Sequence, residues 1–207
     1  MRGIDVEVVS SVTFAEVRRV YLRDHPADQA HEANTNQCGE ENLQRAEDLL
    51  GSWWKVRLSR AEVLGIMLPW HLSEGGKLEL VPRTGLTVGQ AAARIRAGGA
   101  EWAEANPVCA AKLELLKWAP LTPVYLSTRP VPHSDYADLP PTDGLVHLDG
   151  LHRMLVWEVA RRLPRSARLE AFVAGDPRTG PGPRTGPSAA DRPTTPTTPV
   201  RTGDEQT

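Results

Sequence analysis

The sequence has only two cysteines and no long apolar run. These two features exclude several classes of protein. Its two cysteines, Cys38 and Cys109, stand 71 positions apart among 207 residues. This usage predicts a reducing compartment and no disulfide framework. No apolar stretch approaches the ~20 residues needed to span a bilayer, and the first ten residues lack the apolar core of a secretory signal. We therefore expect a cytoplasmic protein that does not contact the membrane.

An excess of charge of one sign is also missing. The 24 Lys and Arg residues nearly balance the 26 Asp and Glu residues, and the formal net charge is −2. Proteins that hold nucleic acid mainly by charge are basic, so we expect no nucleic-acid partner. The phosphate loop Gly-x4-Gly-Lys-Ser/Thr, the motifs Gly-x-Gly-x-x-Gly and Gly-x-Ser-x-Gly, and paired Cys-x-x-Cys are absent. These absences argue against a conventional ATPase, dehydrogenase, serine hydrolase or zinc finger.

The composition changes near residue 174. From there to residue 207 Pro, Thr, Gly and Ser dominate, and Val200 is the only large aliphatic residue. Such a segment cannot bury enough apolar area to offset the entropy lost on ordering. We expect residues 174–207 to form a disordered tail. A proline-rich ligand for a partner domain is a weaker alternative, based on the spacing of Pro193, Pro196 and Pro199.

Residues 1–173 show alternating helix and strand patterns. Capping boxes that begin at Thr13, Ser59 and Thr87 mark three helix starts, and period-two alternation or short apolar runs mark strands. The predicted strands cover residues 4–8, 53–58, 77–81, 123–127, 145–148 and 168–173, and the predicted helices cover residues 13–23, 40–50, 59–68, 87–97, 100–118 and 150–163. This order indicates a mixed α+β fold.

The strongest chemical signal is the run Asp149-Gly150-Leu151-His152-Arg153, where a predicted strand turns directly into a helix. Asp149 is placed to cap the first turn, and Gly150 leaves room for close approach. The first-turn amides, the positive end of the helix dipole and the side chains of His152 and Arg153 can then converge on an anion. The pattern predicts an oxyanion site. The alternative is an ordinary helix start with a surface histidine and a solvated arginine.

This element resembles the ParB/sulfiredoxin-like superfamily, whose core carries a strand, an Asp-Gly-x-His-Arg turn, a helix and a further strand. The resemblance covers about residues 78–173. It implies a mixed sheet with helices in which Gly150, His152 and Arg153 contact phosphate, while Asp149 caps the turn or assists catalysis. Members include nucleotide-binding partition proteins and small-molecule kinases, so the resemblance also implies ATP or another nucleotide with Mg²⁺ as a candidate cofactor.

Two departures from the superfamily pattern narrow this expectation. Leu151 stands where sulfiredoxins carry a reactive cysteine, which argues against peroxide repair. Only the expected disordered tail follows the core, where partition proteins carry a helix-turn-helix domain, which argues against chromosome segregation. We expect a small, divergent actinobacterial member with an N-terminal α/β extension (1–76), a ParB/sulfiredoxin-like core (77–173) and a disordered tail (174–207).

A second polar stretch lies between the first two predicted helices. His31 and Glu32 invite comparison with the zinc-protease motif, but Thr35 stands where that motif needs its second histidine. His31 and Glu32 remain candidate acid and base groups, and Asn34 and Asn36 beside them can hold a polar substrate. The alternative is a solvated loop and helix start.

Two further interpretations concern other histidines. His147, Asp149 and His152 are residue types that suit zinc or iron, but no further histidine or cysteine lies near them in the sequence, so we expect no metal site. The turn at residues 68–76, which contains His71, can form a pocket wall or a lid hinge. A plain connection between two elements is the alternative there.

The leading hypothesis is an enzyme of specialised small-molecule metabolism that binds a phosphorylated or sulfated substrate at Asp149–Arg153. In one version a nucleotide donates a phosphoryl group, with Glu32 or Asp149 as the base. In the other the oxyanion leaves while an internal nucleophile closes a ring. The rival hypothesis is a non-catalytic nucleotide sensor that docks to a partner through the basic run 161–168. A protein partner or a homo-oligomer also stays open.

Overall fold

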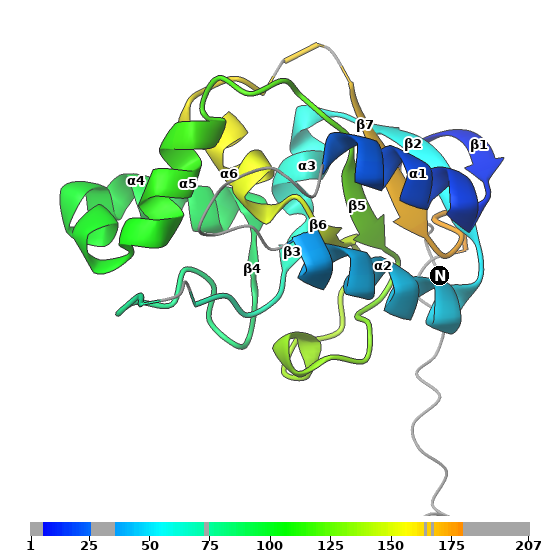
Figure 1. Cartoon of the computed structure of the whole chain (residues 1–207), viewed down its shortest axis with the longest axis horizontal. Helices are drawn as coiled ribbons and strands as arrows, with labels where there is room; N and C mark the ends of the chain where they lie inside the picture. The colour runs from blue at the N-terminus through cyan, green and yellow to red at the C-terminus, as the bar shows by residue number, and fades with distance from the viewer. Residues whose placement is uncertain (1–5, 26–35, 73–74, 164, 167, 180–207) are drawn as a thin grey trace, which may run out of the picture.

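The structure is a computed structural model, and its fold is mixed α+β (Figure 1). This confirms the fold class predicted from the sequence. Most of the expected tail lies outside the described residues, as do His31, Glu32 and Asn34. No helix in the described part of the chain is long and apolar enough to cross a membrane. The described residues are 6–25, 36–72, 75–163, 165–166 and 168–179.

Within these residues the chain forms six α-helices, one 3-10 helix and seven strands. In chain order they are β1 (Glu7–Val12), α1 (Phe14–Asp24), α2 (Asn36–Leu50), β2 (Trp53–Leu58), α3 (Arg60–Gly65), β3 (Met67–Leu68), β4 (Leu86–Thr87), α4 (Val88–Ala105), α5 (Pro107–Leu116), β5 (Val124–Ser127), η1 (Ser134–Tyr136), β6 (Val146–Asp149), α6 (Leu151–Val159) and β7 (Leu169–Ala174).

Three of the helices begin at the predicted capping boxes. The hydroxyls of Thr13, Ser59 and Thr87 each accept a hydrogen bond from the amide three residues later, and the acidic or amide side chain at that position accepts one from the cap amide. The helical stretch predicted over 100–118, with an interruption at Pro107, is confirmed in that division: α4 ends at Ala105 and Pro107 begins α5, although α5 already ends at Leu116. The predicted break before residue 100 appears as a non-helical Gly99 with φ 48° inside α4.

The strand predictions were less accurate at one edge of the sheet. The predicted strand at 77–81 is wrong, because only Val81 pairs there, in an isolated bridge with His71. The edge is formed by the two-residue strands β3 and β4, which the sequence did not predict. The first strand covers Glu7–Val12, so it extends four residues beyond the predicted end at residue 8; residues 4 and 5 of the predicted strand lie outside the described residues.

The seven strands form one mixed sheet in the order β1-β2-β7-β5-β6-β3-β4. β2 pairs with β7 along its whole length, from Trp53 opposite Ala174 to Leu58 opposite Leu169. The β5–β7 and β3–β6 pairs are parallel, and the others are antiparallel. Strands from the expected N-terminal extension and from the expected core therefore share one sheet.

Helices cover both faces of this sheet. Along β7, Ala171 and Val173 pack into one hydrophobic cluster, whereas Phe172 and Ala174 pack into another, as expected when successive side chains point to opposite faces. The first cluster includes residues of α3, α4, α5 and α6, and the second includes residues of α1 and α2. Figure 1 shows α1 and α2 together in front of the sheet.

Candidate functional site

The Asp149–Arg153 element lies where an inner strand of the sheet, β6, runs directly into α6. Gly150 makes this turn with φ 105°, a left-handed conformation that favours glycine. A Cβ at this position would lie 2.8 Å from Cγ1 of Val124 on the neighbouring strand. The sequence places glycine here because both the backbone conformation and the close packing require it.

A β-bulge precedes the turn. Tyr125 of β5 pairs with Asp149 and Leu126 pairs with His147, so Leu148 is an extra residue on β6. The bulge brings His147 and Asp149 opposite consecutive residues of β5. Both residues line the same cavity.

This cavity has a volume of about 340 Å³ and lies at the first turn of α6. Its walls come from the end of α1, the start of α2, the turn after β3, α5 with the loop that follows it, and the β6–α6 junction. Pro69, Trp70 and His71 contribute to one wall, so the turn at residues 68–76 includes a pocket wall. Small-molecule sites typically measure about 300–1,000 Å³, which makes this cavity large enough for a compact ligand.

Arg153 and Asp149 form a largely buried ion pair in the cavity wall. Arg153 donates to Asp149 Oδ2 over 2.5 Å, to Thr122 Oγ1 over 2.6 Å and to the carbonyl oxygen of Pro123 over 2.8 Å. His25 Nε2 lies 3.3 Å from the same carboxylate oxygen. Burial acts to raise the pKa of Asp149, but Arg153 and His25 outweigh it and hold that pKa well below its usual range. The guanidinium is therefore held by protein acceptors.

The prediction that Asp149 caps α6 is wrong. The N-cap residue is Gly150, and no side chain accepts a cap hydrogen bond at the first turn. The carboxylate of Asp149 is held by Arg153 and His25 instead. The first turn of α6 therefore has no side-chain cap. The residues of this turn line the cavity, so the amides and the positive end of the helix dipole lie at the cavity wall.

Lys112 of α5 adds a cationic side chain to the same wall, and no sequence pattern predicted it there. It is half-buried, and burial lowers its pKa, while the carboxylate of Asp149 acts in the opposite direction. Lys112 lies 37 positions before Asp149, so only the fold brings the two together.

His147 is the most unusual polar residue of the cavity wall. It is 8 % exposed, and neither of its ring nitrogens has a hydrogen-bond partner. Burial lowers the pKa of His147 to about 4, so the ring is neutral at physiological pH and offers one donor and one acceptor. Most buried polar side-chain atoms have a partner. Other buried polar atoms without a partner occur outside the cavity, at Trp54, Trp102 and Tyr125 among others, but His147 combines this property with a place in the cavity wall, which makes it a candidate ligand-binding residue.

His152 contacts residues that the sequence analysis did not connect with it. Its Nε2 lies 3.2 Å from Cys109 Sγ, and His71 Nε2 lies 3.4 Å from the same sulfur. Burial lowers the pKa of His71 to about 4 and the pKa of His152 well below its ordinary value. The metal set considered from the sequence joined His152 to His147 and Asp149. The structure instead groups it with His71 and Cys109, which lie on other segments.

The remaining predicted residues lie largely beyond what the structure describes. His31, Glu32 and Asn34 are outside the described residues, and Asn36 begins α2 with a side chain that is also outside them. The described residues on either side of this stretch, His25 at the end of α1 and Gly39 near the start of α2, both line the cavity.

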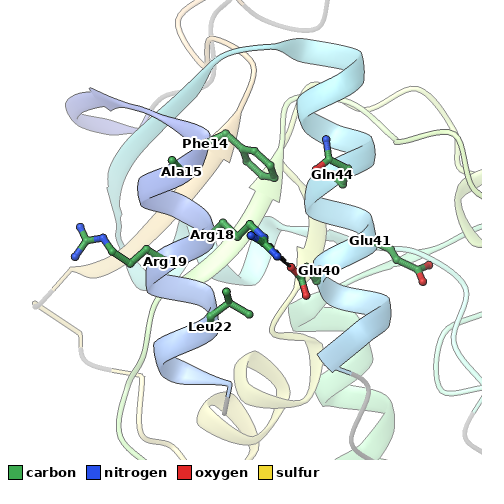
Figure 2. A pocket seen from close by; sticks show the side chains of 8 residues that line it. All are labelled: Phe14, Ala15, Arg18, Arg19, Leu22, Glu40, Glu41 and Gln44. Carbon is green, nitrogen blue, oxygen red and sulfur yellow. Dashed lines mark hydrogen bonds and ion pairs between the residues drawn. The ribbon is translucent and has the colours of Figure 1, made fainter. Parts of the chain in front are cut away.

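A second hollow lies between α1 and α2, with a volume of about 780 Å³ (Figure 2). Arg18 and Glu40 span it with an ion pair of 2.7 Å, and their side chains are 55 % and 35 % exposed. Arg19 and Glu41 point away from it in Figure 2. None of its eight lining residues, all of them described, has a buried polar side-chain atom without a partner. We therefore place the candidate site in the smaller cavity.

One comparison with known proteins gives a match. A protein-family model described as "Family of unknown function (DUF6309)" matches residues 6–192, which is most of the chain. The chain belongs to this family. No curated protein and no solved structure matches it. The function must therefore be argued from the residues of the site.

Two arginines of the basic run at residues 161–168 bond to other residues of the same chain. Arg162 donates to the carbonyl oxygens of Lys117 and Ala119, each over 2.7 Å. Arg168 pairs with Glu7 at 3.3 Å and with Glu62 at 3.2 Å. These two arginines hold the loop after α6 and the start of β7 against the rest of the fold.

Proposed function

We propose that this protein is an enzyme of small-molecule metabolism that binds a phosphate or sulfate group in the cavity at the first turn of α6. One observation carries the proposal: the uncapped first turn of α6 and Lys112 line the same cavity as the unpartnered, buried imidazole of His147. Backbone amides at a helix N-terminus bind anions. A buried polar ring without a partner is costly unless a ligand supplies one.

The local charges support an anion rather than a cation in this part of the cavity. Arg153 and Asp149 compensate each other through their ion pair. Asp24 and Asp135 also line the cavity, but Asp24 pairs with Arg23 and Asp135 lies 3.4 Å from His133. Lys112 and the helix dipole contribute positive potential to the wall at α6. The ring nitrogens of His147 are covered by the surrounding protein, so a polar group of the ligand reaches the donor or the acceptor of the neutral ring only if the wall shifts. The substrate we propose is therefore a compact metabolite that carries one oxyanion and at least one further polar group.

The same groups can assist a displacement reaction. In phosphoryl transfer, and equally in ring closure with loss of the oxyanion, negative charge develops on oxygen atoms next to the first turn of α6. Amides and a lysine that already line the cavity can stabilise this charge with little reorganisation. The proposal thus covers phosphoryl transfer from a nucleotide or intramolecular displacement of the oxyanion. His152, in the same first turn, stays a prediction for contact with the reacting group; its Nε2 lies 3.2 Å from Cys109 Sγ.

The structure suggests revised roles for two of the predicted residues. Asp149 remains ionised at neutral pH because its pKa is strongly lowered, and so weak a base accepts a proton poorly. We infer that Asp149 and Arg153 are positioning residues that fix the β6–α6 junction. His31 and Glu32 stay predictions for the base.

A thermal-shift panel on the full chain tests the proposal. The panel contains phosphate, sulfate, ATP, ADP and CTP, each with and without Mg²⁺. A ligand at 100 times its Kd stabilises the folded state by about 2.7 kcal/mol, which raises the Tm measurably. Lys112→Met should abolish this response. Lys117→Met is the matched control at the C-cap of the same helix, because the side chain of Lys117 pairs with Glu114 at 3.3 Å and does not line the cavity.

The pattern of responses separates the versions of the proposal. A response to phosphate or sulfate alone favours the oxyanion as a leaving group. A response to a nucleotide favours phosphoryl transfer if candidate metabolites turn over, and favours the rival sensing module if none does. The oxyanion site is contradicted if no anion shifts the Tm of the wild-type chain, or if Lys112→Met and Lys117→Met respond equally.

A further inference from the structure

Three potential metal ligands meet beside the cavity although they lie far apart in the sequence. Cys109 Sγ lies 3.4 Å from His71 Nε2 and 3.2 Å from His152 Nε2, and the three atoms are all within 4.8 Å of one another. Cys109 is in the first turn of α5 and His152 in the first turn of α6. The backbone of His71 is hydrogen-bonded to Val81. Each ligand is therefore held by a different ordered segment.

The separations match those around a tetrahedral metal ion. Bonds of about 2.3 Å from zinc to sulfur and about 2.0–2.1 Å from zinc to nitrogen, at tetrahedral angles, place a sulfur and a nitrogen ligand roughly 3.5 Å apart. The two separations from Cys109 Sγ are 3.2 and 3.4 Å. Both sulfur-to-nitrogen separations are therefore within a few tenths of an ångström of the value that one shared ion requires, and the two nitrogens lie within 4.8 Å of each other.

We propose that His71, Cys109 and His152 bind one zinc ion, or a similar transition-metal ion, with a fourth coordination position that faces the cavity. Two imidazoles and a thiolate are a nitrogen and sulfur donor set that zinc favours. His71 and His152 line the cavity, whereas Cys109 is 2 % exposed behind them. Three protein ligands with one open position form the pattern of catalytic rather than structural zinc sites.

The charges around the cluster indicate what the fourth ligand is. Binding displaces the thiol proton of Cys109 to solvent, and the thiolate then offsets one of the two positive charges of the ion. Lys112 adds positive charge nearby. A hydroxide ion or a substrate oxyanion at the fourth position would lower this excess. The metal site would therefore stand next to the proposed oxyanion site, but binding of the metal does not rest on that function.

Cobalt titration of the full chain tests the metal site without any assay of activity. The protein is first treated with a chelator and kept reduced, and Co²⁺ is then added in the absence of phosphate and sulfate. We expect a thiolate-to-cobalt charge-transfer band in the near ultraviolet and the visible bands of four-coordinate cobalt. Both should saturate at one equivalent, and Zn²⁺ should displace the cobalt. Absence of the charge-transfer band at one equivalent would overturn the proposal.

Variants assign the ligands. Cys109→Ser should remove the charge-transfer band, whereas the matched control Cys38→Ser, which changes the exposed cysteine, should keep it. His71→Gln and His152→Gln should each weaken cobalt binding about tenfold or more, because even the partners of metal ligands contribute that much. If Cys109→Ser does not fold, the two histidine variants test the ligand assignment in its place. A band that survives Cys109→Ser, or that Cys38→Ser removes, contradicts the assignment.

The failure of this proposal and the failure of the proposed function give different results. If anions stabilise the chain through Lys112 but cobalt gives no charge-transfer band, the oxyanion site stands and the metal site is overturned. If cobalt binds through Cys109 and no anion stabilises the chain, the metal site stands and the oxyanion site is contradicted.

Discussion

The two hollows of the molecule each contain an arginine paired with a carboxylate, but the two pairs lie in opposite environments. Arg18 and Glu40 lie 2.7 Å apart between α1 and α2, with side chains 55 % and 35 % exposed (Figure 2). Arg153 and Asp149 lie 2.5 Å apart at the start of α6, with side chains 11 % and 18 % exposed. Water screens the first pair and largely not the second.

The contrast shows why the smaller hollow is the better candidate for function. Between α1 and α2 the charges satisfy each other at the surface, and no buried polar side-chain atom of the lining lacks a partner. At α6 the ion pair fixes the wall, while His147 stays unpartnered. Natural proteins retain such locally unfavourable groups mainly where function requires them. Burial and an unpartnered polar group, and not the larger volume, are therefore the grounds on which we choose the candidate site.

The largest expected difference between the two regions is in stability. Arg153→Met leaves Asp149 buried without its main partner, which should lower the free energy of unfolding by about 3 kcal/mol. Arg18→Met, the matched change in the exposed pair, should lower it by less than about 1 kcal/mol. Urea unfolding at pH 7 measures both values. Equal losses would mean that the two pairs do not differ in environment as described.

The wild-type chain and the Asp149→Asn variant should differ in how their free energies of unfolding depend on pH. The folded-state pKa of Asp149 lies below its unfolded value of about 3.9, so its ionised form stabilises the fold above that pH. The contribution is lost as the pH falls through the folded-state pKa. The advantage of the wild-type chain over Asp149→Asn should thus be greatest above pH ~4 and should shrink below it. Urea unfolding at a series of pH values checks this; a constant difference would contradict it.

The smallest expected effect on stability comes from His147. Because neither ring nitrogen has a partner, His147→Leu removes a buried polar group at little cost in volume. The free energy of unfolding should stay within about 1 kcal/mol of wild type or rise, while stabilisation by the anion that binds should weaken. Chemical unfolding with and without that anion separates the two effects. A large loss of stability would instead make His147 a structural residue.

The sequence predicted those parts of the fold that depend on contacts a few residues apart. The boxes at Thr13, Ser59 and Thr87 placed three helix starts because each box closes within four residues. The two-residue strands β3 and β4 are too short to show a period. The apolar residues between 77 and 81 look like a strand, but the strand pairing of this segment is limited to the isolated bridge between Val81 and His71.

The candidate site follows the same rule. The Asp149–Arg153 element was found because its residues are contiguous, although its helix cap was assigned to the wrong residue. Three other residues of the site lie far away in the sequence: Lys112 is 37 positions before Asp149, and Cys109 and His71 are 43 and 81 positions before His152. A local sequence pattern cannot show that such distant residues are neighbours in the fold. The arrangement of α5 and the turn after β3 against α6 brings them together.

The most direct test of the central claim is to locate the bound anion. Backbone and imidazole ¹H–¹⁵N NMR spectra of the full chain are recorded while inorganic phosphate, and separately sulfate, is added. We predict saturable shifts at the amides of Leu151, His152 and Arg153 and at the ring nitrogens of His147, and none at Arg18 or Arg19. Shifts confined to the hollow between α1 and α2, or no saturable shift with either anion, would contradict the account.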